Sequence, residues 1–169
     1  MALSAAGPIP PEVVVQGLKD ARIDFIASLV QDGIICILRL LDEERGVTRV
    51  HLSREEEGFG ICAGAYLGGK NPAILMHNTG LLACCNAVVS LNLPHEFPVL
   101  LLVSYSGYFG EQNAWTASPG KTTESVLNAL AIQYRILREP SEVSPVLVAA
   151  HQLMHASKRP VAVLLPPGR

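Results

Sequence analysis

Three consecutive glutamates are the residues of this chain best placed to do chemistry. Glu55, Glu56 and Glu57 follow an extended apolar stretch at residues 47–52 and open a predicted helix at residues 54–67. Carboxylates suit the positive end of the helix dipole, so solvated surface charges are the plain interpretation. This helix is also rich in glycine and alanine, and each interior glycine costs about 1 kcal/mol relative to alanine. That cost indicates close approach of another backbone or of a ligand, which makes one of the carboxylates a candidate buried acid.

A second group of polar residues follows another predicted strand. His77, Asn78, Thr79 and Gly80 come directly after the apolar run at residues 73–76. Capping of the next helix by Asn78 or Thr79 is one interpretation, because both residue types are favoured caps. Contact with a bound ligand is the other. His77 is a candidate for substrate contact or proton relay, and the alternative is a packed histidine whose nitrogens bond to the backbone.

A third polar segment follows the most apolar predicted strand. It contains Tyr105, Ser106 and Glu111, and we expect it to continue as a loop of about 17 residues to Lys121. Loops of that length without structure of their own usually serve function or an interface rather than simple connection. Trp115, the one tryptophan of the chain, lies in this segment and is expected to anchor it or a partner.

Composition narrows the class of protein. A chain of 169 residues fits one domain, here residues 1–169 with a core of about residues 11–165. The hydrophobic fraction is 49% and the formal charge is −2, while the mean hydropathy is +0.31. Such apolarity indicates a doubly covered sheet, a large subunit interface, or both. We expect no nucleic-acid binding, since there is no basic run, and no membrane span, since no long uninterrupted apolar run occurs.

Neither cysteines nor histidines indicate a metal site. The cysteines lack C-x-x-C spacing and lie in apolar runs, so we expect no zinc, no disulfide and a reducing, cytoplasmic setting. His151 and His155 share a helix face at spacing i, i+4, but the sequence shows no third ligand, and we favour structural roles for them. We therefore expect this chain to hold no metal ligands. The four cysteines are Cys36, Cys62, Cys84 and Cys85.

Strands and helices alternate along the chain. The strand signals are near-continuous Val, Ile and Leu runs, which are typical of strands buried on both faces. We predict an α/β fold: a doubly wound, mostly parallel six-stranded sheet with helices on both faces. Ligands of such sheets bind at the carboxyl ends of the strands. The predicted strands cover residues 23–29, 47–52, 73–76, 98–104, 134–137 and 160–165, and the predicted helices cover residues 11–22, 34–42, 54–67, 81–91, 122–131 and 144–157.

Three blocks, in order, resemble the pyrimidine-binding (PYR) domain of thiamine-diphosphate enzymes. Residues 54–70 match the pattern R-E-E-E-G-x-G-I-x-A-G-A-Y-L-x-G-K almost throughout. Residues 72–87 resemble P-A-x-L-M-Q-N-S-G-L-G-N-S-x-N-A, and residues 105–111 resemble Y-R-G-x-x-G-E. These patterns are typical of the α subunits of two-subunit sulfopyruvate decarboxylases and of the N-terminal halves of phosphonopyruvate decarboxylases. A Rossmann dinucleotide site is disfavoured, because no G-x-G-x-x-G follows the first strand.

The resemblance implies a cofactor and a catalytic glutamate. In the wider family this glutamate stands ten residues before a tyrosine, and counting back from Tyr66 selects Glu56, with Glu55 and Glu57 as its expected solvated neighbours. Glu56 is thereby expected to hydrogen-bond the aminopyrimidine of thiamine diphosphate, with Asn78, Thr79 and Gly80 also beside the cofactor. The same resemblance implies decarboxylation of a small 2-oxo acid, most directly 3-sulfopyruvate to sulfoacetaldehyde and CO₂. His77, Tyr105, Ser106 and Glu111 are the expected substrate contacts.

Departures from the pattern keep alternatives open. His77 stands in place of the usual glutamine and Ser106 in place of the usual arginine, while residues 82–85 replace a Gly-Asn-Ser turn. An arginine would suit a sulfonate or phosphonate through bidentate contacts. Phosphonopyruvate or another 2-oxo acid, decarboxylated or used in carboligation, therefore stays open as substrate. A non-catalytic, PYR-like regulatory subunit is the further alternative.

The resemblance also implies a partner. Thiamine-diphosphate enzymes anchor the diphosphate and Mg²⁺ through a G-D-G…N-N run, and this chain contains none. The expected partner is a β subunit that carries that run, in at least an α₂β₂ assembly. Mg²⁺ would then be held mainly by the partner.

Overall fold

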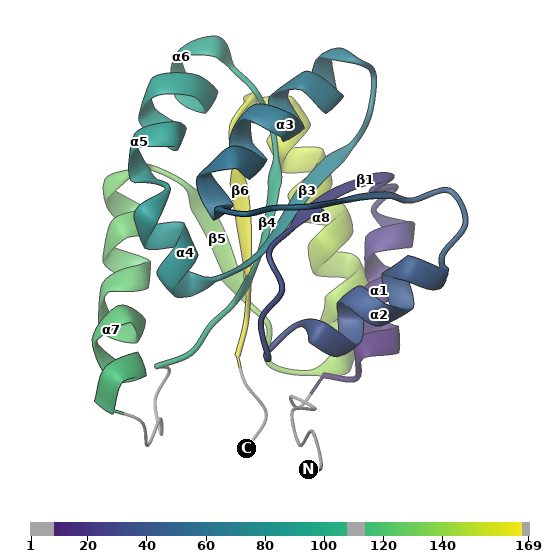
Figure 1. Ribbon diagram of the computed structural model, residues 1–169, viewed down its shortest axis with the longest axis horizontal. Coiled ribbons are helices and arrows are strands. Elements are labelled where there is room, and N and C mark those ends of the chain that lie inside the picture. Colours follow the sequence, from purple (N-terminus) through teal and green to yellow (C-terminus); the bar gives the residue numbers. More distant parts are fainter. Residues whose placement is uncertain (1–8, 108–113, 167–169) are drawn as a thin grey trace.

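The computed structural model describes residues 9–107 and 114–166. Their six strands form one sheet in the order β2-β1-β3-β4-β6-β5, and every adjacent pair is parallel (Figure 1). The predicted class is confirmed, with a sheet that is wholly rather than mostly parallel. The strands are β1 (Phe25–Ser28), β2 (Thr48–His51), β3 (Pro72–His77), β4 (Leu100–Ser104), β5 (Gln133–Ile136) and β6 (Val161–Leu165).

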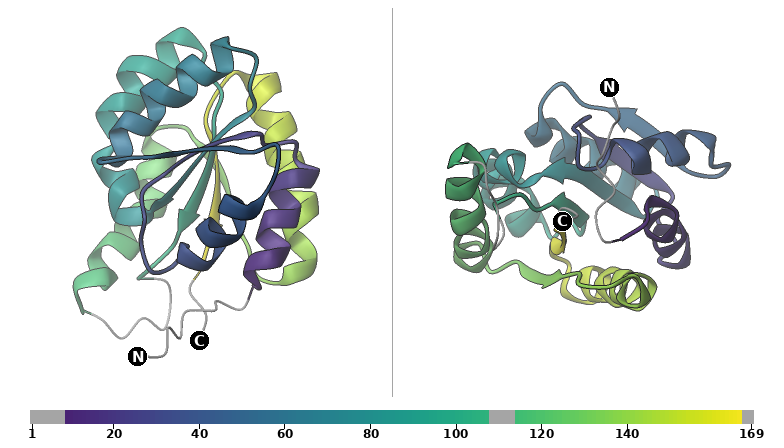
Figure 2. Two further views of the ribbon diagram at one scale, coloured as in Figure 1. Left: turned by 45° about the vertical axis from the view of Figure 1, so that its right-hand side comes forward. Right: turned by 90° about the horizontal axis from the view of Figure 1, so that it is seen from below.

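Helices cover both faces of the sheet, as the two further views in Figure 2 show. One face packs against α1 (Pro11–Asp20), α2 (Ile35–Glu43) and α8 (Val143–Ser157). The other packs against α3 (Glu55–Leu67), a helical segment of several short pieces, and α7 (Ala114–Ala129). No helix among the described residues is both long and apolar enough to cross a bilayer. The short pieces are α4 (Asn78–Ala83), α5 (Cys85–Ala87), the π-helix η1 (Val88–Asn92) and α6 (Leu93–His95), and a 3₁₀ turn, η2 (Pro140–Glu142), precedes α8.

The central strands explain the high apolar content. All residues of β4 and β6 are buried, and so are the first five of β3. Alternate side chains of these strands enter the two separate core clusters, one on each face. The near-continuous hydrophobic runs therefore have the cause that the sequence predicted, which is coverage of the sheet on both sides.

The prediction of a long loop after β4 is wrong for the second half of that segment. Helix α7 begins at Ala114, eight residues before the predicted start at Thr122. Pro119 lies inside the helix, where a proline normally disfavours helix formation, and Gly120 follows it. Gly120 packs directly on the backbone of Gly107, whose φ is +80°. This close backbone crossing requires glycine at both positions, and it fixes α7 against the segment that follows β4.

Trp115 does not anchor this segment within the described residues. It lies in the first turn of α7, and 76% of its surface is exposed. Its role as an anchor for a partner stays a prediction.

Gly58 is the glycine of α3 where close packing leaves no room for a side chain. A Cβ at this position would stand 2.9 Å from Leu52 Cδ1 and 3.3 Å from Ile74 Cγ2, whereas a Cβ at Gly64 would meet nothing within 4 Å. We expect Gly58→Ala to lower the free energy of unfolding by about 1–3 kcal/mol through overpacking. Gly64→Ala is the matched control, expected to be neutral or stabilising by up to about 1 kcal/mol. Urea unfolding of both variants checks this, and equal stability of the two would contradict it.

Candidate functional site

The polar segments singled out from the sequence meet at the carboxyl edge of the sheet. His77 at the end of β3 lies in register with Ser104 at the end of β4. Helix α3 starts after β2 and packs against α4, which starts directly after β3. The helix starts at Glu55 and Asn78 therefore lie close together, at the edge where parallel sheets bind ligands.

The three glutamates of α3 have three different surroundings. The Glu57 carboxylate accepts hydrogen bonds from the backbone amides of Ser53 and Arg54, at 3.1 and 3.4 Å. Glu57 thus caps the helix. Glu56 forms an ion pair with Arg54, at 2.9 Å between Oε1 and Nη2, and its side chain is 39% exposed. Both of these carboxylates are already engaged within the chain, at or near the surface.

Glu55 is the glutamate that faces the neighbouring helix. Its carboxyl lies against Gly80 of α4 so closely that a methyl group at Gly80 would overlap its Cγ, Cδ and Oε1 atoms. Glu55 makes no hydrogen bond or ion pair with any residue that the structure describes. Its charge acts on His77 and on Cys84 of the same edge. The carboxylate is therefore not engaged by any other side chain or backbone group of the described residues.

His77 is the cap of α4, which corrects the expectation that Asn78 or Thr79 caps that helix. Its Nδ1 accepts a hydrogen bond from the Thr79 amide at 3.2 Å and lies 2.7 Å from the Thr79 hydroxyl. Because Nδ1 accepts, the proton of the neutral ring resides on Nε2, which lies 2.9 Å from Ser106 Oγ and donates to it. Burial lowers the pKa of His77, and the negative charge of Glu55 opposes this shift. His77 is consequently neutral at pH 7.

Asn78 connects three elements at the floor of this edge. It is fully buried, and its Nδ2 donates to the Ser106 carbonyl and to the Thr123 hydroxyl, both at 2.9 Å. Its Oδ1 is buried without a hydrogen-bond partner among the described residues. Such an acceptor is costly to leave unpaired, so it indicates a donor from outside those residues.

The predicted substrate residues after β4 separate in the structure. Ser106 lies at the edge, on the His77 imidazole. Tyr105 is buried, and its hydroxyl lies 3.1 Å from the Gly120 carbonyl and 3.0 Å from the Glu124 carboxylate, both in α7. That contact gives Tyr105 a role in attaching α7 to the end of β4. Glu111 lies outside the described residues.

Gln31 is a residue of this edge that the sequence did not reveal. It follows β1, and its Oε1 accepts from the Gly33 amide at 2.8 Å. Its Nε2 is buried and has no partner in the part of the chain that the structure describes. Gly33 packs against Ser104 Oγ, which brings this turn to the end of β4. The Asp32-Gly33 pair in the sequence signals this turn, but not the direction of the Gln31 side chain.

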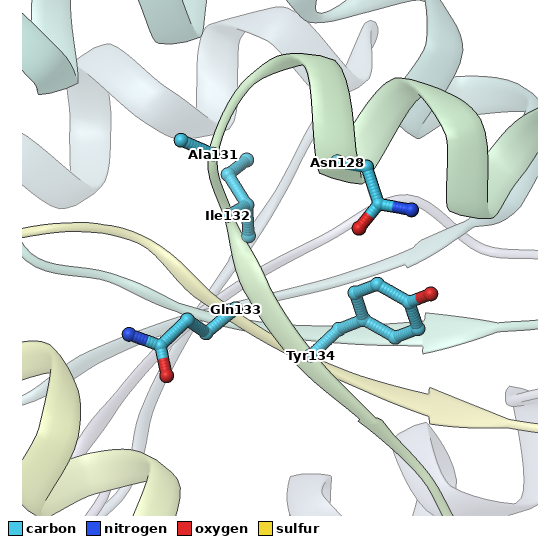
Figure 3. Close-up of a pocket in the computed structure, with 5 residues that line it drawn as sticks. All are labelled: Asn128, Ala131, Ile132, Gln133 and Tyr134. Atoms are coloured by element: carbon cyan, nitrogen blue, oxygen red, sulfur yellow. The ribbon is translucent and has the colours of Figure 1, made fainter.

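A shallow hollow of about 360 Å³ lies elsewhere, at the turn between α7 and β5 (Figure 3). Asn128, Ala131, Ile132, Gln133 and Tyr134 line it. It adjoins the amino end of β5, at the opposite edge of the sheet from Glu55 and His77. We therefore assign it no part in the candidate site.

The chain has the PYR fold of thiamine-diphosphate enzymes: an all-parallel, doubly wound sheet in this strand order, with a helix that starts with glutamates at its carboxyl edge. The structure is similar to a chain of the 2-oxoglutarate:ferredoxin oxidoreductase of Magnetococcus marinus, with a TM-score of 0.67 and 14% identity over 96% of this chain and 29% of that one. No protein-family model matches the sequence.

Curated relatives narrow the class further. The chain is 36% identical to "Sulfopyruvate decarboxylase subunit alpha" of Methanocaldococcus jannaschii over 151 residues, 89% of each chain. It is 36% identical to the subunit of that name from Methanothermobacter thermautotrophicus, over 91% of this chain and 93% of that one. A phosphonopyruvate decarboxylase of Streptomyces viridochromogenes is 21% identical, over 92% of this chain and 40% of the relative. The chain belongs to the family of sulfopyruvate decarboxylase α subunits.

Proposed function

We propose that this chain is the pyrimidine-binding α subunit of a thiamine-diphosphate-dependent decarboxylase that acts on 3-sulfopyruvate. The observation that carries the proposal is the free carboxylate of Glu55 beside Gly80, on a fold shared with 2-oxo acid enzymes. Relatives that match along nearly their whole length bear the sulfopyruvate decarboxylase name, which supports the substrate.

The residues at the edge fit an aminopyrimidine. The Glu55 carboxyl group can share a proton with a ring nitrogen, and Asn78 Oδ1 is a buried acceptor without a donor among the described residues. Thiamine diphosphate, when bound, supplies the carbanion and the electron sink for decarboxylation. The chain's own part is to hold the ring nitrogen through the glutamate and to shield the site from water. Mg²⁺ is expected to be held mainly by the partner.

We assign the cofactor contact to Glu55, with Glu56 as the alternative that the count from Tyr66 selects. Helical residues advance by about 100° each. Buried Gly58 and Cys62 stand three and seven positions after Glu55, which places Glu55 on the buried face of α3. Glu56 is turned about 100° from that position and pairs with Arg54.

His77 and Ser106 are the proposed substrate contacts. Their hydrogen bond occupies the place where related chains have glutamine and arginine, so this edge offers a serine hydroxyl that is held by an imidazole N–H, rather than a guanidinium. A neutral pair of this kind binds an anionic group less tightly than arginine does. Other 2-oxo acids therefore stay candidate substrates and should be assayed beside 3-sulfopyruvate as a panel. They include phosphonopyruvate and 2-oxo acids with an uncharged alkyl or aryl group.

The partner is proposed to be a β subunit with the diphosphate- and Mg²⁺-binding run, in at least an α₂β₂ assembly. The α-subunit names of the relatives support the existence of a second subunit. Helix α3 supports it as well, because Gly60, Gly64 and Leu67 leave an exposed face of small and apolar residues. An exposed apolar face of this kind is typical of a subunit interface.

Co-expression with the candidate β subunit tests the function. The purified complex, supplied with thiamine diphosphate and Mg²⁺, is expected to release CO₂ from 3-sulfopyruvate faster than from the other 2-oxo acids of the panel. Preference for another 2-oxo acid would overturn 3-sulfopyruvate as the substrate, but the chain would still be a subunit of a 2-oxo acid decarboxylase. A stable complex that binds no thiamine diphosphate would favour the non-catalytic, regulatory subunit.

His77 gives a pH prediction. Its pKa lies below the ordinary value of about 6.5, so the neutral ring persists below that pH. Protonation would place a proton on Nδ1 and break the bond from the Thr79 amide. We expect kcat/KM to be constant above pH 6.5 and to fall as the pH drops through the folded-state pKa. His77→Ala should reduce turnover, leave cofactor affinity unchanged and abolish this acid limb; unchanged turnover would reject a role in substrate contact.

A further inference from the structure

Two histidines and an asparagine converge at the amino edge of the sheet, away from the candidate active site. Nε2 of His151 lies 3.2 Å from Oδ1 of Asn71, and Nε2 of His155 lies 3.1 Å from the same oxygen. The histidines are one turn apart on α8, and Asn71 directly precedes β3. The histidine pair alone lacked a third ligand in the sequence, and the fold supplies one from 80 positions away.

These separations suit ligands of one metal ion. Zinc lies about 2.0–2.1 Å from a histidine nitrogen and about 2.0–2.2 Å from an oxygen. Two such atoms at an angle of roughly 95–110° around one ion stand about 3.1–3.4 Å apart, as the Nε2 and Oδ1 atoms do. The two imidazole rings have centroids 4.5 Å apart and planes at 68°, so both nitrogens face the same oxygen without stacking.

The third ligand is held in place from both sides. The Asn71 amide donates to Asp24 Oδ1 at 2.8 Å, and the Asp24 amide donates to the Asn71 carbonyl at 3.3 Å. The ring of Tyr66, from α3, lies 6.0 Å from that of His155 and orients it; α8 ends beside α3 (Figure 1). Asn71 and both histidines are half-buried, so water can complete the coordination.

The protonation state of the two histidines favours metal binding, whereas the nearby positive charges oppose it. Burial lowers the pKa of both histidines, which keeps them neutral and able to bind a metal. The nearby positive charges of Arg22 and Lys158 oppose a cation, and Lys70 is offset by Asp24 at 3.6 Å. The site therefore needs an ion with a strong preference for imidazole nitrogen, which transition metals have and Mg²⁺ and Ca²⁺ lack.

We propose that His151, His155 and Asn71 form a site for a divalent transition metal ion such as Zn²⁺, which ties the end of α8 to the start of β3. No group of three or more His, Cys, Asp or Glu side chains that could hold a metal gathers among the described residues, and the third ligand proposed here is the amide oxygen of Asn71. On binding, the single ring proton of each neutral histidine moves from Nε2 to Nδ1, and Nε2 then holds the ion. The competing interpretation is a clamp in which both histidines simply donate hydrogen bonds to Asn71.

Calorimetric titration of the full-length chain with ZnCl₂, at neutral pH with the thiols kept reduced, tests the site. We expect one ion per chain, and an affinity at least about tenfold lower in His151→Gln and His155→Gln. Asn71→Asp should bind more tightly, because it replaces an amide oxygen by a carboxylate. His51→Gln is the matched control, because His51 ends β2 at the opposite, carboxyl edge of the sheet and should leave binding unchanged.

Three results would overturn the proposal. Absence of saturable binding would leave only the hydrogen-bonded clamp. Binding that survives in both histidine variants would place the ion elsewhere, for example on the part-exposed thiols of Cys36 and Cys85, which a Co²⁺ spectrum with thiolate charge-transfer bands would reveal. Weaker binding in Asn71→Asp would show that the oxygen of residue 71 is not a ligand.

Discussion

Replacing Glu55 by glutamine is expected to lower decarboxylation by the reconstituted enzyme at least about 100-fold, the range in which positioned acid–base groups act. The amide keeps the shape of the side chain beside Gly80 but removes the charge and the capacity to share a proton. Folding and assembly with the partner should be unaffected, because Glu55 makes no hydrogen bond or ion pair among the described residues. Steady-state turnover of 3-sulfopyruvate and calorimetric binding of thiamine diphosphate are the measurements.

Glu56→Gln is the matched control, one residue away and with the same chemical change. It removes a surface ion pair to Arg54, and such pairs contribute about 0–1 kcal/mol. We expect near-normal turnover. The reverse result, an inactive Glu56→Gln with an active Glu55→Gln, would contradict the geometric assignment and support the count from Tyr66. Full activity of both variants would exclude these carboxylates from catalysis.

The fold was largely predictable because its strands are buried on both faces. Strands of that kind appear as unbroken Val, Ile and Leu runs, such as residues 98–104 and 160–165, and alternating helices force parallel crossovers. The start of α7 was not predictable in this way. Pro119 and Gly120 are residues of turns by local preference. They are accommodated because Gly107 lets the two backbones cross, a contact between segments that composition does not encode.

The candidate site was predictable as a place but not as a set of contacts. The carboxyl ends of β2, β3 and β4 follow from parallel topology, which brought Glu55, His77 and Ser106 to one edge. Which of three adjacent glutamates faces inward depends on a rotation of about 100° per residue. That rotation is fixed by packing at Gly58 rather than by charge. Gln31 reaches this edge through the turn after β1, and the direction of its side chain depends on contacts that the sequence does not show.

The electrostatics of the edge follow from the same packing. Burial raises the pKa of Cys84 to about 12, with Glu55 and then Glu56 adding to the effect. The thiol is therefore protonated, and residues 82–85, which replace a polar turn in related chains, present no reactive thiolate from Cys84. Glu55 is then the negative charge nearest to the neutral His77, which suits an acid–base role for the glutamate and a hydrogen-bonding role for the histidine.

Replacing Gly80 by alanine is expected to lower turnover about 100-fold while leaving the protein folded. The added methyl group would overlap the Glu55 carboxyl, so that side chain must rotate away from α4. A displacement of about 1 Å in a catalytic group can cost about 100-fold. Alanine is the better helix former, and therefore stability should not fall by more than about 1 kcal/mol. Gly60→Ala is the control for the stability of the chain, since a methyl group there meets nothing within 4 Å; it should leave the free energy of unfolding unchanged or raise it by up to about 1 kcal/mol.

The double variant Gly80→Ala/Glu55→Gln separates displacement of Glu55 from any direct contact of Gly80 with the cofactor. If Gly80 acts only by leaving room for the carboxyl, its substitution has little further effect once the carboxylate is gone, and the double variant matches Glu55→Gln. If the methyl group instead blocks the cofactor, the two losses multiply and thiamine-diphosphate affinity falls in both variants that carry alanine. The first result ties the glycine to the glutamate as one catalytic unit. The second would place the cofactor directly on α4. The role of Glu55 would then be judged from the Glu55→Gln variant alone.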